Sequence, residues 1–418
     1  MRIAMFTNNY KPYTGGVPVS IERLSMGLRR QGHEVYIFAP SYGDKSVDND
    51  TEDGYVIRYA SYKKRLDGGF VIPKSSDPLI KKELKRINPD IIHTHHPMLI
   101  GSRAVELGAR YSIPVVYTYH TRYEDYLHYI SLYRKIEELG EKGSGIAGKA
   151  AEKIDILSKR KLLTAYMRGF IKKCDLVFSP SLLTERIVDE LKTGVPQVRL
   201  ATGIEDRFYC GEKNIELRSK LSGGKSLVLC TVTRLSKEKN IEFILKSLRV
   251  FKERFGDDFK YVLIGDGPAR NELETMAHNL GIADNVHFAG NINNSEVHKY
   301  YSACDIFLFA SKSETQGIVL LEAMASSMPV VAVNAGGVED VVRNGKNGFM
   351  TPENERDFAN KLYITAANNM MDGRYSRGAR ETADMYTVNK MAQKAQEGYL
   401  SAILENQAKM GVARRHTA

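Results

Sequence analysis

Tryptophan is absent from the 418-residue sequence, and cysteine occurs only four times. The cysteines lie in or beside apolar segments and show no spacing typical of metal ligands: Cys174, Cys210, Cys230 and Cys304. We therefore expect buried, reduced thiols, as in a cytoplasmic protein. No apolar run approaches the ~18 residues that a membrane-spanning helix needs, and the N-terminal residues lack the length and flanks of a signal peptide. The sequence thus predicts a cytoplasmic chain, either soluble or peripheral on a membrane.

Several functional signatures are also missing. No zinc-finger, RRM-type or helix-turn-helix pattern is present, so we expect no nucleic-acid partner. The Gly-x-Gly-x-x-Gly fingerprint and its ribose-binding acid are absent as well. Their absence argues against an NAD-dependent oxidoreductase.

Positive charge is concentrated in the first half of the sequence. Residues 1–200 contain 32 Lys and Arg against 23 Asp and Glu, whereas the remaining residues contain 28 against 27. This excess implies that one domain faces something anionic, such as a membrane surface. Residues 123–173 interleave basic with apolar side chains, as membrane-surface helices do. A basic helix packed on its own domain has the same composition, so both interpretations stay open.

Short apolar segments alternate with helical patterns along most of the chain. In the first half, strands are expected at residues 2–7, 34–39, 91–93, 115–118 and 176–179, and the first helix at 17–30. The second half repeats the pattern from residue 226 onward. Such alternation predicts parallel sheets with helices on both faces. The fold class is therefore α/β, with two doubly wound, Rossmann-like domains that meet just past residue 200.

Two glutamates, Glu314 and Glu322, lie eight positions apart after a predicted strand. Glu314 falls in the loop, and Glu322 in the opening turns of a helix that begins near Gly317. A carboxylate among apolar neighbours such as Leu320 and Leu321 costs free energy unless something hydrogen-bonds it. The hydroxyls of a polyol ligand would meet that need. A solvated helix position is the alternative for Glu322.

Two loops at strand ends are suited to phosphate. Gly15 and Gly16 join the first strand to the first helix, where free backbone N–H groups can bind an anion. Arg234 and Lys239 follow the first strand of the second domain, where a planar guanidinium and a compact ammonium group could bind an anion. A tight turn with positive φ is the alternative for the glycines, and loop solubility for the lysines.

In their order along the chain, these elements resemble retaining glycosyltransferases of family four, which have the two-domain GT-B fold. The resemblance covers nearly the whole sequence. It implies an acceptor-side domain at 1–200, a nucleotide-sugar domain at 201–385, and a C-terminal helix at 386–418 that crosses back to the first domain. It also implies retention of anomeric configuration, with the leaving phosphate taking the acceptor proton.

The resemblance further implies roles for single residues. Arg234 and Lys239 would bind the diphosphate, Glu314 would face the donor sugar, and Glu322 would hold the ribose hydroxyls. The backbone around Asn291 and Ile292 would meet the nucleobase, which leaves the identity of the base open. Other implied donor contacts are Gly15, Gly16, Gln316, Gly317 and Ile318.

Histidines gather at two strand ends. His93, His95 and His96 have no companion Cys or His set with zinc spacing, so a structural or rim role is expected. His120 matches the family histidine that contacts the donor sugar near the reacting carbon, with a satisfied core histidine as the alternative. The Asp48–Asp50 stretch superficially matches the metal motif of the other glycosyltransferase fold but reads as a polar loop. We therefore predict no catalytic metal and no cofactor beyond the nucleotide-sugar substrate.

Residues 117–129 and 314–317 look like the corresponding regions of bacterial 1,2-diacylglycerol 3-glucosyltransferases. The sequence thus predicts a hexosyltransferase that moves glucose from UDP-glucose to a membrane diacylglycerol, in glycolipid biosynthesis. Its predicted catalytic residues are His120, Arg234, Lys239 and Glu314. Two alternatives stay open: a soluble family-four enzyme acting on a small sugar or thiol precursor, and a non-catalytic nucleotide-binding protein.

Overall fold

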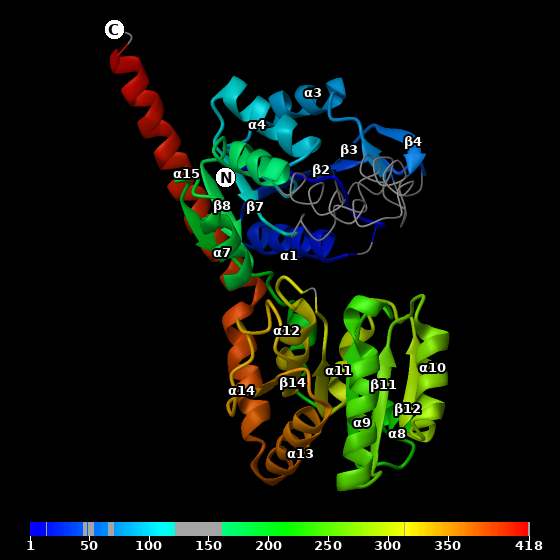
Figure 1. The fold of residues 1–418 in the computed structure, drawn as a ribbon. Helices are drawn as coiled ribbons and strands as arrows, with labels where there is room; N and C mark the ends of the chain where they lie inside the picture. Colours follow the sequence, from blue (N-terminus) through cyan, green and yellow to red (C-terminus); the bar gives the residue numbers. More distant parts are fainter. Residues whose placement is uncertain are drawn as a thin grey trace, which may run out of the picture. The chain divides into compact units, whose positions relative to one another are not determined.

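The computed structural model describes residues 1–13, 15–44, 48, 54–65, 71–121, 161–312 and 314–416. The chain forms two compact units (Figure 1). Unit 1 comprises Met1–Ala201 and Met391–Ala418, and unit 2 comprises Thr202–Lys390. The predicted doubly wound α/β class is confirmed, because each unit contains a parallel sheet with helices on both faces.

Unit 1 is built on a seven-stranded sheet in the order β3-β2-β1-β6-β7-β8-β9. Every pairing in this sheet is parallel. Its strands are β1 (Arg2–Phe6), β2 (Glu34–Pro40), β3 (Val56–Tyr59), β6 (Ile91–Thr94), β7 (Val115–Thr118), β8 (Leu176–Ser179) and β9 (Gln197–Arg199). A separate antiparallel pair is formed by β4 (Ser61–Arg65) and β5 (Val71–Pro73).

Helices cover both faces of this sheet. They are α1 (Gly16–Arg30), α3 (Pro78–Ile87), α4 (Ile100–Tyr111), α7 (Leu182–Glu190) and residues 161–171. One face, which carries Ala4 and Tyr117, packs against α3, α4, α7 and 161–171. The other face receives the C-terminal helix α15 (Val388–His416), whose Gly398 lies so close to Phe178 that a Cβ would approach its ring to 2.7 Å.

Unit 2 contains a six-stranded parallel sheet in the order β12-β11-β10-β13-β14-β15. Its strands are β10 (Leu227–Val232), β11 (Phe259–Ile264), β12 (Val286–Gly290), β13 (Ile306–Phe309), β14 (Val330–Val333) and β15 (Gly348–Thr351). Its helices are α8 (Ile215–Ser222), α9 (Ile241–Phe255), α10 (Arg270–Asn279), α11 (Val297–Ala303), α12 (Ile318–Ala325), α13 (Glu355–Asp372) and α14 (Arg374–Ala383). Short 3₁₀ turns are η3 (Asp206–Phe208), η4 (Lys237–Lys239), η5 (Ala283–Asn285) and η6 (Asp384–Tyr386).

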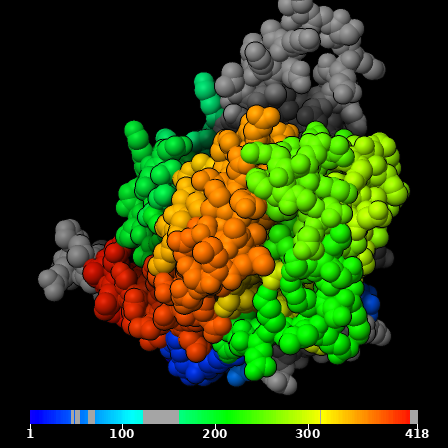
Figure 2. Space-filling view, turned by 90° about the horizontal axis from the view of Figure 1, so that it is seen from below, coloured from blue at the N-terminus to red at the C-terminus, as the bar shows by residue number. Residues whose placement is uncertain are grey.

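The alternation of side chains along the strands of unit 2 divides its core into two layers. Val228 and Cys230 of β10 pack with α8, α11, α12 and α14 on one face. Leu227 and Leu229 pack with α9, α10 and α13 on the other. In Figure 2 the surfaces of α9 and α13 lie side by side, in green and orange. Because both faces of β10 are covered, its residues are buried except for the half-buried Val232 at the carboxyl end, as expected for a central parallel strand.

In each sheet, the strand order reverses direction once. The reversal falls between β1 and β6 in unit 1 and between β10 and β13 in unit 2. Loops that leave the carboxyl ends of two such strands diverge to opposite faces and open a crevice where ligands bind in doubly wound folds. These two strand ends are therefore the places to look for a site.

The cysteines are free thiols in the structure. The prediction that they are buried is correct for Cys174, Cys230 and Cys304, whereas Cys210 is only half-buried. Cys210 lies just beyond η3, outside the sheet core, because the chain there is still crossing the surface toward α8.

Candidate functional site: the switch point of unit 2

The loop after β10 carries the two predicted diphosphate ligands. Arg234 is exposed, and Lys239 lies in η4 immediately before α9. Leu235, fully buried between them, anchors the loop: its N–H donates to the Asp266 carbonyl at 3.0 Å, and its carbonyl accepts from the Ala269 N–H at 3.0 Å. The cation-bearing loop is thus tied to the loop that follows β11.

Positive charge dominates this loop. Burial opposes ionisation of Glu238, but a hydrogen bond from Ser236, a backbone hydrogen bond and the charges of Lys239 and Arg234 together lower its pKa. The Glu238 carbonyl accepts from the Lys312 N–H at 3.1 Å, which joins the loop to the segment after β13. Loops from the two strands that flank the reversal are therefore held together by backbone contacts.

Lys239 and Glu314 meet across this switch point. Lys239 Nζ lies 3.3 Å from Glu314 Oε2, and the side chains are 23% and 21% exposed. Partly shielded from water, this pair is screened less than a surface pair, yet it stays accessible to a ligand. A diphosphate has the charge to compete with Glu314 for Lys239, so the structure brings the predicted cation and the predicted sugar-facing acid to one place.

Helix α12 begins directly after Glu314. Gly317 is its N-cap, with a left-handed φ of 70°, and a Cβ there would lie 2.8 Å from Leu320 Cδ1. The left-handed φ favours glycine here, and a side chain would also have to displace Leu320. Ile318, half-buried, opens the helix, whose first N–H groups have no partner within it. The helix start therefore lies beside the Lys239–Glu314 pair, where unpaired N–H groups favour an anion.

Glu322 is buried in the second turn of α12, with 7% of its surface exposed. Tyr301 of α11 donates its hydroxyl hydrogen to Glu322 Oε2 at 3.2 Å. A carboxylate surrounded by the apolar core of unit 2 needs such donors. The alternative of a solvated helix position is therefore wrong, and sequence inspection gave no sign of Tyr301 as its partner.

Gln316 is buried as well and faces the start of unit 2. Its Oε1 accepts from the Thr202 N–H at 3.0 Å, and its Nε2 has no partner in the described part of the chain. Gly337, in the loop after β14, packs against the backbone of Thr315 and Gln316. The donor contact predicted for Gln316 stays a prediction, because its oxygen is used here to hold backbone.

The loop after β12 lies along the same edge of the sheet of unit 2. Asn291 is exposed, and Ile292 is half-buried against the apolar cluster that includes α12. The Gly290 carbonyl accepts from the Gly265 N–H at 2.8 Å, so the ends of β11 and β12 are linked. The strand ends of unit 2 thus place their loops along one edge, and the predicted donor residues of this unit lie on these loops or, for Ile318 and Glu322, in the first two turns of α12.

Predicted site residues in unit 1

The predicted glycine loop leads into α1, with Thr14 outside the described residues. Gly15 has an extended backbone at φ 173°, and Gly16 is the first residue of α1. Neither glycine has a left-handed φ, so the alternative of a tight turn with positive φ is wrong. A Cβ on Gly16 would meet nothing within 4 Å, which leaves the helix start open to a ligand.

The histidines of the two strand ends form one cluster. His93, in β6, and His95, just after it, are buried, whereas His96 and His120 are half-buried. His93 bonds Thr118 Oγ1 through Nε2 at 2.6 Å and the Tyr399 hydroxyl through Nδ1 at 2.7 Å. Because both rings are buried, a position at the rim of a site is wrong for His93 and His95. A structural role fits His93, because both of its ring nitrogens are hydrogen-bonded.

Burial lowers the pKa of every ring in this cluster. The pKa of His93 falls to about 3 and that of His96 to about 4. Burial, with smaller contributions from neighbouring histidines, also puts the pKa values of His95 and His120 well below the ordinary value. The imidazoles are thus neutral near pH 7 and take part as hydrogen-bonding groups.

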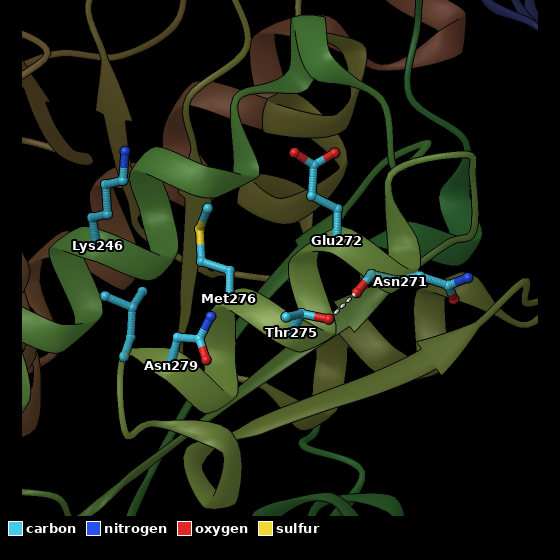
Figure 3. Close-up of a pocket in the computed structure, with 7 residues that line it drawn as sticks. Lys246, Asn271, Glu272, Thr275, Met276 and Asn279 are labelled. Carbon is cyan, nitrogen blue, oxygen red and sulfur yellow. Dashed lines mark hydrogen bonds between the residues drawn. The ribbon is translucent and has the colours of Figure 1, made fainter.

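Three further features of the described residues were considered as sites: a surface hollow, metal-binding clusters and membrane-spanning helices. A surface hollow lies between α9 and α10 and is lined by Lys246 of α9 and by Glu272, Thr275 and Met276 of α10 (Figure 3). It sits on the helical flank of unit 2 and includes none of the predicted donor residues. Over the part of the chain described here, no cluster of three or more His, Cys, Asp or Glu has metal-site geometry, and the prediction of no metal stays a prediction. In the same residues, no helix combines the length and apolar character needed to span a bilayer.

Known proteins similar to this chain confirm its class. Residues 14–202 match Glycosyltransferase Family 4, and residues 212–382 match Glycosyl transferases group 1. The alpha-monoglucosyldiacylglycerol synthase of Streptococcus pneumoniae is 34% identical, over 100% of this chain and 89% of that protein. The synthase of the same name from Acholeplasma laidlawii is 28% identical, over 98% and 99%.

Solved structures agree on the fold. The crystal structure of Anabaena HepE in complex with UDP has a TM-score of 0.71 at 18% identity, covering 96% of this chain and 100% of that one. Sucrose-phosphate synthase from Thermosynechococcus elongatus has a TM-score of 0.73 at 17% identity, over 97% and 99%. Two doubly wound units of this kind are the GT-B fold. The chain belongs to glycosyltransferase family four and is a hexosyltransferase that uses a nucleotide sugar.

Proposed function

We propose that the protein is a retaining, metal-independent glucosyltransferase that moves glucose from UDP-glucose to the free hydroxyl of a membrane 1,2-diacylglycerol. The observation that carries the proposal is the Lys239–Glu314 pair, at 3.3 Å across the switch point of unit 2. Full-length similarity to synthases named for monoglucosyldiacylglycerol supports the choice of sugar and acceptor.

The proposed donor site divides its work among four side chains. Arg234 and Lys239 neutralise the diphosphate as negative charge builds on it, so the proposal includes no metal ion. Glu322, buried beside Tyr301, accepts hydrogen bonds from the ribose hydroxyls. Glu314 faces the glucose once the diphosphate has taken over Lys239. His120 has a separate proposed role, as a hydrogen-bonding group for a substrate hydroxyl.

In the proposed reaction, the bond between the anomeric carbon and the diphosphate oxygen breaks, and the acceptor oxygen attacks that carbon from the same face. The acceptor proton passes to the departing phosphate oxygen, so no separate general base is required. Retention follows because entering and leaving groups share one face. Unit 1 is the acceptor side in this scheme, and unit 2 holds the nucleotide.

The protein is proposed to work as a peripheral protein on the cytoplasmic face of the membrane. Support comes from the surplus of basic residues in the first 200 positions. The basic amphipathic segment 123–173 belongs to this proposal, although residues 122–160 lie outside the described part of the chain. A surface bearing anionic lipid would attract such a domain and bring it to its acceptor.

Transfer assays with a panel of nucleotide sugars, each with and without vesicles containing diacylglycerol, test the proposal. We expect UDP-glucose and vesicles together to give a glycolipid whose anomeric proton has the α configuration by NMR, unaffected by a metal chelator. Transfer to a small sugar without lipid would instead support the soluble alternative. Tight nucleotide binding without turnover on any acceptor would support a non-catalytic protein.

A further inference from the structure

His95 and His120 come from neighbouring parallel strands and meet beyond their carboxyl ends. Strands β6 and β7 pair in register, and each histidine lies just past its strand. The two rings meet edge to edge, with their planes 22° apart and their centroids 5.2 Å apart. His95 Nδ1 lies 2.9 Å from His120 Nε2, so the rings share one hydrogen bond.

The surroundings decide the direction of this bond. Both rings are neutral, so one nitrogen of the pair carries the hydrogen and the other accepts it. His95 is only 1% exposed, and its Nε2 has no partner among the residues that the structure describes. A buried N–H without an acceptor costs more than an unused lone pair. His95 therefore holds its hydrogen on Nδ1 and donates it to His120 Nε2.

The tautomer of His120 follows from this direction. A neutral imidazole has one N–H, and Nε2 of His120 is the acceptor, so the hydrogen is on Nδ1. His120 is half-buried, and Nδ1 is the ring nitrogen left for a ligand. We infer that His95 is a positioning residue that locks His120 as the Nδ1–H tautomer, so that His120 offers a neutral donor to a substrate hydroxyl oxygen.

His95 is itself held in place from behind. Its ring lies against His93, with centroids 4.1 Å apart, and His93 is fixed by hydrogen bonds to Thr118 and to Tyr399 of α15. A ring packed in this way cannot turn to present its other nitrogen without breaking these contacts. The orientation of His120 thus depends on a chain of contacts through the buried side chains of His95 and His93.

The inference uses the proposed function to assign the ligand of His120, but the tautomer can be measured without any activity. Long-range ¹H–¹⁵N correlation spectra of the full-length protein with ¹⁵N-labelled histidine distinguish protonated from bare ring nitrogens, and loss of one signal set in His120→Asn assigns it. We expect Nδ1 of His120 to be protonated and Nε2 bare at neutral pH. A protonated Nε2 in the unmodified protein would overturn the inference.

Two substitutions of His95 test the positioning role. His95→Asn keeps a side-chain N–H close to the position of Nδ1, whereas His95→Leu fills similar space without a donor. We expect mixed tautomers of His120 in His95→Leu, with kcat lower by about 3- to 10-fold, as the loss of one neutral hydrogen bond predicts. His95→Asn should restore both the spectrum and the rate, with the donor KM little changed in either variant.

The outcomes separate the two proposals. An unchanged His120 spectrum in a folded His95→Leu would refute the positioning role, whatever the activity. If His95→Leu fails to fold, His95→Asn and the unmodified protein still test the direction of the bond. The expected spectrum in a protein that transfers no glucose would leave the tautomer assignment standing and contradict the proposed function alone.

Discussion

At the switch point of unit 2, the two predicted diphosphate ligands have different surroundings. Lys239 is paired with Glu314, while the neighbouring Arg234 is exposed. A nucleotide diphosphate would exchange the carboxylate partner of Lys239 for phosphate oxygens and release Glu314 toward the sugar. If the proposed diphosphate site is correct, its occupancy and the placement of Glu314 are coupled through the Lys239 ammonium group.

Replacing this ammonium group tests the coupling. We expect Lys239→Ala to lower kcat for transfer by about 10²- to 10³-fold, as the loss of one fixed group that stabilises developing charge usually does. Lys237→Ala is the matched control, because Lys237 lies exposed on the same 3₁₀ turn. Release of UDP and formation of product, followed together, give the rates. Near-normal turnover in Lys239→Ala would contradict the assignment.

The buried His93 ring makes the stability of the protein depend on pH. Burial lowers its folded-state pKa to about 3, whereas an unfolded histidine titrates near ~6.5. The unfolded chain therefore binds a proton that the folded chain refuses. The contribution of His93 to the free energy of unfolding is therefore fully present above pH ~6.5 and is lost as pH falls toward 3.

We expect His93 to cost about 2 kcal/mol of unfolding free energy between pH 7.5 and pH 5, from the ~1.5 pH units below the unfolded pKa. Denaturant unfolding at several pH values measures it. His95 and His120 should add in the same direction, because burial lowers their pKa values too. His93→Asn should be less stable at pH 7.5 yet lose less on acidification, and equal pH slopes for the two proteins would refute the account.

At the scale of elements, two strands inside the sheet of unit 1 were the most predictable. Strands β7 and β8 have the bounds expected from sequence, because short apolar runs buried on both faces leave little choice. The edge strands β3, β9 and β15 were not predicted, since their pairing depends on neighbours distant in sequence. The contacts of His95 with His120 and of Tyr301 with Glu322 could not be predicted either, because the partners are distant in sequence.

In the loops around the proposed donor site, Gly337 packs closely against neighbouring backbone. Gly337 has φ +79°, and a Cβ there would lie 2.9 Å from the Gln316 N and from the Thr315 carbonyl. Ordinary contacts are longer, so any side chain would push the loop that carries Glu314. The position was not identified from sequence, because nothing near it marks the partner loop.

Gly337→Ala should therefore lower activity by more than a loss of folding stability alone would explain. Gly345→Ala is a matched control, because Gly345 has a similar φ of +75° but nothing within 4 Å of a Cβ. Both variants should lose roughly 1–2 kcal/mol of unfolding free energy from the left-handed backbone. Only Gly337→Ala should also lose about 10- to 100-fold in kcat/KM, since small displacements at a reacting centre are costly. Equal activities in the two variants would disprove the packing argument.

Across the whole molecule, charge is distributed unevenly between the two halves of the sequence. The first 200 residues contain 32 basic and 23 acidic side chains, and the rest contain 28 and 27. Long-range attraction to an anionic surface depends on this net charge, and salt screens it: the Debye length falls from ~10 Å at 0.1 M to ~3 Å at 1 M. If the proposed membrane docking is electrostatic, binding must weaken as salt rises.

We expect the protein to sediment with vesicles containing anionic phosphatidylglycerol at ~0.1 M salt, and to be released at ~1 M, where screening is nearly complete. Neutral phosphatidylcholine vesicles should bind far less. Lys172 and Lys173, both exposed in unit 1, offer a local test. Replacing both by Ala should reduce binding, whereas the same change at Lys213 and Lys220 of unit 2 removes equal charge and should not. Salt-independent binding, or equal effects of the two double variants, would rule out docking through the basic half.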